Sequence, residues 1–150
     1  MEDKKIPVVI VHKGYKDYLK HNLMVTGKNN KIYLIGNKNL ENLSKLPNVT
    51  FVNIDKYEND PLVKDLKKYF KNYSSYKFNW IWMAGTLRIL SIYLFLKEYK
   101  FDQVFNTDSD NILLRDINTL NFTEKIGYNI MKNYNNEFRM AASIGNALIN

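Results

Sequence analysis

The sequence predicts an open α/β/α sandwich, in which three layers hold a mostly parallel sheet in the middle. Short, continuous apolar runs rich in valine and isoleucine alternate with helical stretches, which is typical of parallel strands covered on both faces. In addition, 45% of the 150 residues are hydrophobic, which is enough for one core and excludes an intrinsically disordered chain. We therefore expect residues 1–150 to form a single domain.

In the first half of the chain, strands and helices are predicted to alternate. Each helix has a boundary signal: Gly27 follows the first, Pro47 stops the second, and Asp60 caps the third, which begins at Pro61. The predicted elements are a strand at 6–12, a helix at 15–25, a strand at 31–35, a short helix at 40–46, a strand at 49–54 and a helix at 61–70.

The second half contains one long apolar stretch, which raises the question of a membrane span. Arg88 lies at its centre and would be costly in lipid, so a buried amphipathic helix is expected instead of a transmembrane segment. The predicted elements are a polar, aromatic loop at 72–79, a long helix at 80–98, a strand at 103–107, a loop with one helical turn at 111–120 and a strand at 140–150.

The apolar residues near the two ends of the chain suggest where the protein is located and whether its domain is complete. The apolar run at 6–11 is too short for a signal peptide, so we expect a cytoplasmic protein. The last residues are still apolar and strand-like. Because a domain rarely stops inside a buried strand, we expect that the C-terminal remainder of the domain is missing from this chain.

The amino-acid composition excludes some kinds of functional site and limits the kinds of binding partner. Cysteine is absent, which excludes disulfides, thiolate metal sites and a cysteine nucleophile. The net charge of +7 suggests an anionic partner, but nearly all of the basic residues are lysine. A protein that reads DNA is expected to use more arginine, because the guanidinium group matches phosphates and guanine edges. We therefore expect no nucleic-acid partner, and keep a basic nucleic-acid-binding module as an alternative.

The strongest motif is Asp108-Ser109-Asp110, which directly follows the predicted strand at 103–107. In open parallel sheets, ligands bind beyond the carboxyl ends of the strands. If the strand continued, its alternation would place both carboxylates on one side, where they repel each other unless a cation lies near. The motif therefore predicts a hard divalent ion with oxygen ligands, able to hold a diphosphate. The alternative is a solvated acidic turn that caps the next helix.

Two other Asp-x-Asp chemistries can be tested on spacing. A calcium-binding EF-hand loop would need an oxygen ligand at position 112 and a glutamate at 119, where this chain has Ile112 and Thr119. A haloacid-dehalogenase-like phosphatase using Asp108 and Asp110 would need threonine or valine at position 112, and a lysine and further acids downstream. That phosphatase stays open as an alternative.

With these residues in view, the sequence resembles a nucleotide-sugar-dependent glycosyltransferase of the GT-A fold, of the glycogenin-like or a related family. The features that carry the resemblance extend from Val8 to Asn150 and include the Asp108-Ser109-Asp110 motif. The others are the strand and turn at 9–15, the long helix with Arg88, the run at 103–107 and the small-residue run at 143–150.

This resemblance implies roles for individual residues. Asp110 would bind Mn²⁺ or Mg²⁺ directly, and Asp108 would contact the metal, the ribose or both, with Ser109 between them. Val11, His12 and Tyr15 would frame the base and ribose of the donor.

Arg88 would point toward the nucleotide-sugar, or would form a structural ion pair with Asp108, Asp102 or another acid. The implied partners are a UDP- or GDP-sugar, with UDP favoured, and a glycan, protein or lipid acceptor. No catalytic base can be named from the sequence. The available carboxylates are Asp116, Glu124 and Glu137.

Overall fold

The computed structural model describes residues 5–72, 79–120, 131–132, 138–139 and 146–149. Strands and helices alternate along the chain, as the sequence predicts. The strands are β1 (Val8–His12), β2 (Ile32–Gly36), β3 (Val49–Asn53), β4 (Val104–Thr107), β5 (Met131–Lys132), β6 (Phe138–Arg139) and β7 (Asn146–Ile149). The α-helices are α1 (Asp17–Thr26), α2 (Pro61–Asn72) and α3 (Asn79–Tyr99), and the 3₁₀ helices are η1 (Lys38–Lys45), η2 (Ile54–Tyr57) and η3 (Ile117–Thr119).

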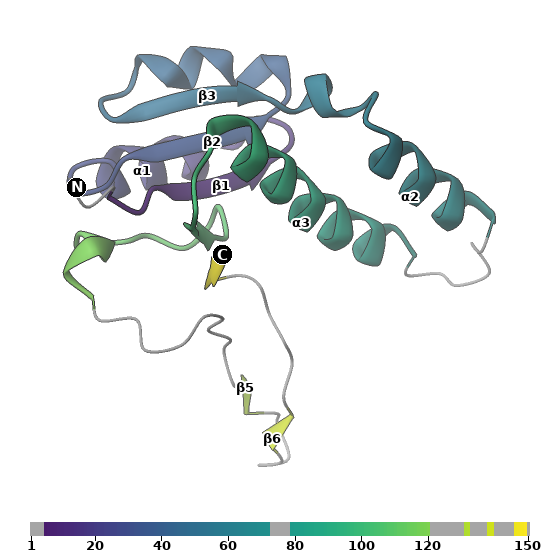
Figure 1. The fold of residues 1–150 in the computed structure, drawn as a ribbon. Coiled ribbons are helices and arrows are strands. Elements are labelled where there is room, and N and C mark those ends of the chain that lie inside the picture. Colours follow the sequence, from purple (N-terminus) through teal and green to yellow (C-terminus); the bar gives the residue numbers. More distant parts are fainter. Residues whose placement is uncertain (1–4, 73–78, 121–130, 133–137, 140–145, 150) are drawn as a thin grey trace.

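The central sheet has the strand order β3-β2-β1-β4-β7 (Figure 1). The first four of these strands are parallel, and β7 pairs antiparallel with β4. The order reverses direction at β1, because the chain first adds β2 and β3 on one side and then returns to place β4 on the other. In parallel sheets such a switch point leaves a crevice at the carboxyl ends of the flanking strands, here β1 and β4.

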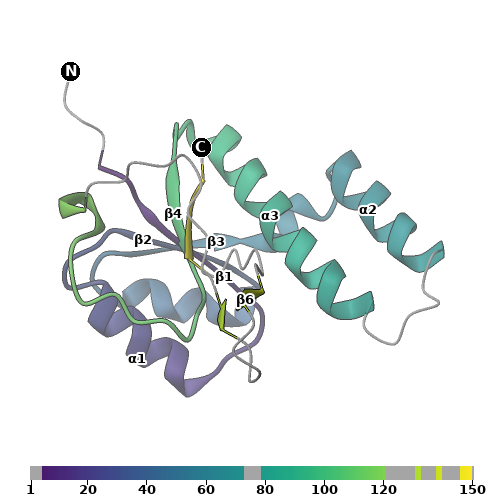
Figure 2. The same ribbon diagram turned by 90° about the horizontal axis from the view of Figure 1, so that it is seen from below.

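One face of the sheet is covered by α1 and η1 (Figure 2). Alternate strand residues such as Val8 and Ile10 point to this side and are fully buried. They pack against Leu19 and Leu23 of α1 and Leu40 of η1. The four-residue spacing of the two α1 leucines gives the helix one apolar stripe, which docks on the sheet.

The opposite face is covered by α3, with η2 and α2 beside it (Figure 2). Here Val9 and Ile35 contact the apolar side of α3, where Phe95 is fully buried. The helix ends at Tyr99, and Lys100 follows with a positive φ of 54°. The Phe101 N–H then donates to the Leu96 carbonyl at 3.2 Å, which closes the end of the helix.

The α/β fold with helices on both faces of a mostly parallel sheet is confirmed. Two features were not expected from the sequence: η2, and the short antiparallel pair β5 and β6. Of the strand predicted at 140–150, residues 146–149 form β7, and the others lie outside the described residues, as do 73–78 of the predicted loop. Among the helices of the described chain, none is long and apolar enough to cross a membrane.

Candidate active site

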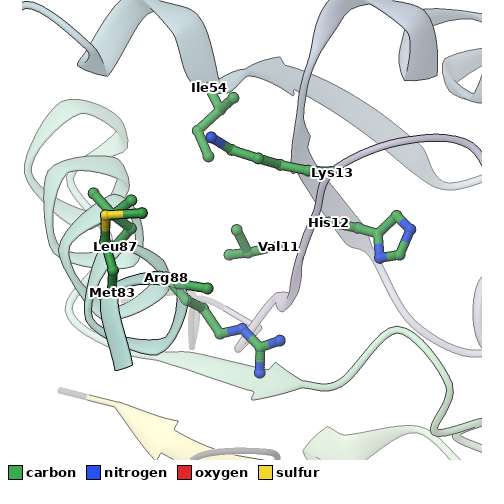
Figure 3. Close-up of a pocket in the computed structure, with 8 residues that line it drawn as sticks. Val11, His12, Lys13, Ile54, Met83, Leu87 and Arg88 are labelled. Carbon is green, nitrogen blue, oxygen red and sulfur yellow. The ribbon is translucent and has the colours of Figure 1, made fainter. Parts of the chain in front are cut away.

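A cavity of about 350 Å³ opens where β1 ends and α3 passes over the sheet (Figure 3). Its position is the crevice expected at the switch point of the sheet. The walls are mainly apolar, with two cationic side chains at the edge. The lining residues are Val11, His12, Lys13, Ile54, Met83, Ala84, Leu87 and Arg88.

Three elements supply the apolar wall. Val11 lies at the centre of the view, Ile54 begins η2, and Met83 and Leu87 come from α3 (Figure 3). The two α3 residues are four apart and therefore share one face of the helix. Such an apolar slot suits a flat ring system, with polar groups at its edge to fix the orientation.

Lys13 brings one positive charge to the cavity. Its side chain extends toward Ile54 (Figure 3), and its Nζ lies 3.9 Å from Oε1 of Glu58. Glu58 also pairs with Lys67, so one carboxylate is shared between two lysines. The Lys13 side chain is about half exposed, so it can exchange Glu58 for an anion at the cavity edge.

His12 lies at the end of β1, with its ring directed away from Met83 and Leu87 (Figure 3). The ring packs edge-on against Tyr18, with centroids 6.0 Å apart. Burial lowers the pKa of His12 most strongly. A hydrogen bond with the Gly14 backbone acts in the opposite direction.

More distant charges also act on the His12 pKa. Arg88 and Lys16 lower it, whereas Asp110 raises it. The net effect is a lowered pKa, so the imidazole is neutral at pH 7. Its Nε2 is buried and makes no hydrogen bond within the described part of the chain.

Arg88 connects the cavity with the acidic motif. Its guanidinium forms an ion pair with the carboxylate of Asp108, the first residue after β4. The structural alternative considered for Arg88, an ion pair with Asp108, is therefore present. About a third of each side chain is exposed, so an incoming ligand can reach both groups.

The acidic motif lies in a turn and not in an extended strand, which corrects one premise of the sequence argument. β4 ends at Thr107, and the Asn111 N–H donates to the Asp108 carbonyl at 3.1 Å, closing a turn over residues 108–111. Strand alternation therefore does not set the directions of the two carboxylates. Asp110 is exposed, and its carboxylate makes no ion pair or hydrogen bond with another described residue.

The remaining predicted residues lie outside the cavity wall. Tyr15 is 48% exposed and lies two residues before α1. Ser109 is almost buried, and its backbone carbonyl accepts a hydrogen bond from Asn22 of α1. A role for either residue in binding a donor stays a prediction.

Among the carboxylates available as a base, Asp116 is engaged in a structural role. It accepts a hydrogen bond from the backbone N–H of Asn118 at the start of η3, and it pairs with Lys5 at 4.0 Å. Glu124 and Glu137 lie outside the described residues.

The acidic turn fits one kind of metal site. Within the described ranges, no three His, Asp or Glu side chains form a group that could hold an ion alone. Magnesium is commonly bound through one or two carboxylates together with substrate phosphates, and Mn²⁺ prefers similar oxygen ligands. Asp110, with Asp108 in the same turn, could supply the protein share of such a set.

Five cavity residues were not among the predicted site residues: Lys13, Ile54, Met83, Ala84 and Leu87. The α3 members have a signal in the sequence, because Met83 and Leu87 are four residues apart, as are Ala84 and Arg88. Ile54 had no such signal, since its place depends on how η2 packs against β2 and α3.

A second, larger hollow of about 660 Å³ lies between α2 and α3. Its walls include Leu62, Tyr69, Ile89 and Tyr93, and its acidic member is Asp65. None of the predicted site residues lines it. It is also farther from the carboxyl ends of β1 and β4, so the first cavity is the better candidate for a ligand site.

The sequence matches no protein-family model, and no curated protein matches it significantly. A solved structure described as PaToxG Glycosyltransferase is similar in fold, with a TM-score of 0.52 and 16% sequence identity. The similarity covers 87% of this chain and 50% of that one, so this chain spans half the length of that structure. The chain therefore has a glycosyltransferase-like α/β fold.

Proposed function

We propose that this chain binds a nucleoside-diphosphate sugar and transfers the sugar to an acceptor hydroxyl in a metal-dependent reaction, with a UDP-sugar favoured as donor. One observation carries the proposal: Arg88 lines the cavity and is also paired with Asp108 of the acidic turn. The apolar cavity, the Arg88 guanidinium and the acidic turn thus lie next to one another. A nucleotide-sugar with a bound metal has its base, its diphosphate and the metal in the same order.

The chemistry of the cavity fits the nucleotide half of such a donor. The walls formed by Val11, Ile54, Met83 and Leu87 are apolar enough to hold a base. Arg88 has a planar fork of N–H donors that matches a phosphate group. It therefore suits the diphosphate at the edge of this slot.

The acidic turn fits the reacting end of the donor. Asp110 would hold Mn²⁺ or Mg²⁺, and Asp108 would join it when Arg88 turns toward the phosphates. The metal would neutralise the charge that grows on the departing nucleoside diphosphate. The acceptor is a hydroxyl of a glycan, protein or lipid.

Calorimetry of the chain with Asp110→Asn tests the proposal. The wild type should bind a UDP-sugar more tightly with Mn²⁺ than with EDTA, and the variant should lose this difference because its amide is a weaker metal ligand. The matched control is Asp65→Asn, which removes the same charge from an exposed position on α2. Equal affinity of wild type and Asp110→Asn in the presence of Mn²⁺ would refute the assignment.

Two further assays distinguish the alternative functions from glycosyl transfer. A nucleic-acid-binding module would bind oligonucleotides with strong salt dependence and no need for Mn²⁺. A phosphatase would release inorganic phosphate from a phosphomonoester, and this activity would depend on Asp108 and Asp110.

A thermal-shift screen of nucleoside diphosphates and sugar nucleotides, with and without Mn²⁺, identifies the base that the chain prefers in its donor.

A further inference from the structure

Helix α1 and the turn that follows it carry three polar side chains that are almost completely buried. Asn22, Thr26 and Asn30 have relative exposures of 1%, 0% and 3%. Asn22 and Thr26 are four residues apart on one side of α1, and Asn30 lies in the turn that follows the end of the helix at Thr26. A buried amide or hydroxyl is costly unless it is hydrogen-bonded, so these side chains must have partners.

The partners of Asn22 lie in the acidic turn, 87 and 89 residues farther along the chain. The Asn22 side-chain amide donates to the Ser109 carbonyl at 2.8 Å and to the Asn111 carbonyl at 2.9 Å. These are the two carbonyls on either side of Asp110. The Asn22 side chain thus holds the backbone at both neighbours of the exposed carboxylate.

Asn22 is itself held in place. The Thr26 hydroxyl donates to the side-chain oxygen of Asn22 at 2.7 Å and accepts from the Leu113 N–H at 3.0 Å. Both N–H groups and the oxygen of the Asn22 amide are therefore used. This fixes the orientation of the amide, and with it the distance between α1 and the turn.

We propose that Asn22 is a positioning residue, which holds Asp110 in the direction that metal binding requires. The inference rests on the proposed function. The Asp110 carboxylate has no hydrogen-bond or ion-pair partner of its own in the described chain, so its direction depends on the backbone of the turn. Residues that orient metal ligands typically affect metal affinity by about 10- to 100-fold when they are removed.

Asn30, in the turn that follows α1, provides a matched control. Its amide donates to the Arg115 carbonyl at 2.9 Å and to the Thr26 carbonyl at 3.1 Å, and its oxygen accepts from the Ile117 N–H at 3.0 Å. Asn22 and Asn30 are thus equally buried and make three such bonds each. Only Asn22 contacts the acidic turn.

The experiment compares Asn22→Ala and Asn30→Ala. Urea denaturation measures the stability of each variant, and the free Mn²⁺ signal in electron paramagnetic resonance measures Mn²⁺ binding in the presence of UDP. Both variants should lose similar stability, but Asn22→Ala should weaken Mn²⁺ binding by about 10- to 100-fold. Asn30→Ala should change it by less than about threefold, and UDP affinity in EDTA should be the same in both.

Equal Mn²⁺ affinity in Asn22→Ala and Asn30→Ala would overturn the role of Asn22, while the proposed function would stand. A wild type that does not bind Mn²⁺ with UDP would overturn the proposed function, and the role of Asn22 with it. If Asn22→Ala does not fold, Thr26→Val replaces it. That variant keeps the shape of the side chain and removes the hydroxyl that orients Asn22, so Mn²⁺ binding should weaken in the same direction. Unchanged Mn²⁺ affinity in Thr26→Val would also overturn the inference.

Discussion

Arg88 of α3 and Asp108 at the end of β4 form an ion pair at the mouth of the candidate cavity. The two residues are 20 positions apart in the sequence and come from elements on different layers of the fold. Because the pair is partly exposed, both groups can exchange their partner for a ligand. In the proposed reaction, the arginine would move to the diphosphate and the aspartate would become available to the metal.

Replacement of Arg88 by alanine is therefore expected to have two opposite effects. The affinity for a UDP-sugar should fall by about 10- to 100-fold, since a hydrogen bond to a charged group is worth about 1.5–3 kcal/mol. The affinity for Mn²⁺ alone should rise, because Asp108 loses its competing cation. Calorimetry measures the first effect, and electron paramagnetic resonance of free Mn²⁺ measures the second.

The control for Arg88→Ala is Lys56→Met, which breaks the ion pair between Lys56 and Glu98 at the C-terminal end of α3. This variant should show a similar change in melting temperature and no change in donor affinity. If Arg88→Ala lowers the melting temperature strongly and leaves donor affinity unaltered, the Arg88–Asp108 pair is only structural.

Gly36 is a second point at which the fold shapes the site. It ends β2 opposite His12 of β1, and a Cβ there would lie 2.6 Å from the His12 carbonyl oxygen and 2.7 Å from Cδ1 of Leu40. Gly36→Ala should therefore cost about 1–3 kcal/mol in the free energy of unfolding, measured by urea denaturation.

Gly85, which lies within α3, is expected to have the opposite effect on stability when it is replaced by alanine. At Gly85 an added Cβ would have no described atom within 4 Å, so Gly85→Ala should stabilise the chain by about 0.5–1 kcal/mol. If Gly36→Ala were as stable as the wild type or more stable, the close approach of β2 to the end of β1 would be contradicted.

His12 should make stability depend on pH. Its pKa in the folded chain is lowered, chiefly by burial, whereas an unfolded chain binds a proton near pH 6.5. Arg88 and Lys16 add to the lowering, and the Gly14 backbone and Asp110 oppose it. Between these two pKa values the unfolded chain holds more protons, so the stability present above about pH 6.5 is lost as the pH falls.

Urea denaturation between pH 8 and pH 5 measures this dependence. The variant His12→Gln should lose less stability than the wild type across this range. An identical pH profile for His12→Gln and the wild type would show that His12 does not contribute.

Local patterns were sufficient to predict most of the framework. The valine- and isoleucine-rich runs form β1, β2 and β3, because a continuous apolar run is stable only when both of its faces are covered. Asp60 accepts from the Leu62 N–H at 2.9 Å and begins α2, as its place before Pro61 predicts. Such signals depend on residues that are close in the chain.

The acidic motif could be found in the sequence, but the conformation of its backbone could not be predicted. An apolar run followed by Asp108-Ser109-Asp110 predicts a strand end, and β4 does end at Thr107. The turn that follows could not be predicted, because it is held by Asn22, whose bonds to it cross 87 and 89 residues. The four-residue spacing of Asn22 and Thr26 was a visible signal of polar contacts on one side of α1, although it does not identify their partners.

By itself, the sequence determined the alternation of strands and helices, the covered parallel sheet and the position of an acidic motif after a strand. Each of these follows from periodicity and from capping, which act over a few residues. The tertiary structure decided that Val11, Leu87 and Arg88 share one cavity, and that Arg88 pairs with Asp108. These contacts depend on how α3 crosses β1 and β4, and that crossing is set by side-chain packing between distant parts of the chain.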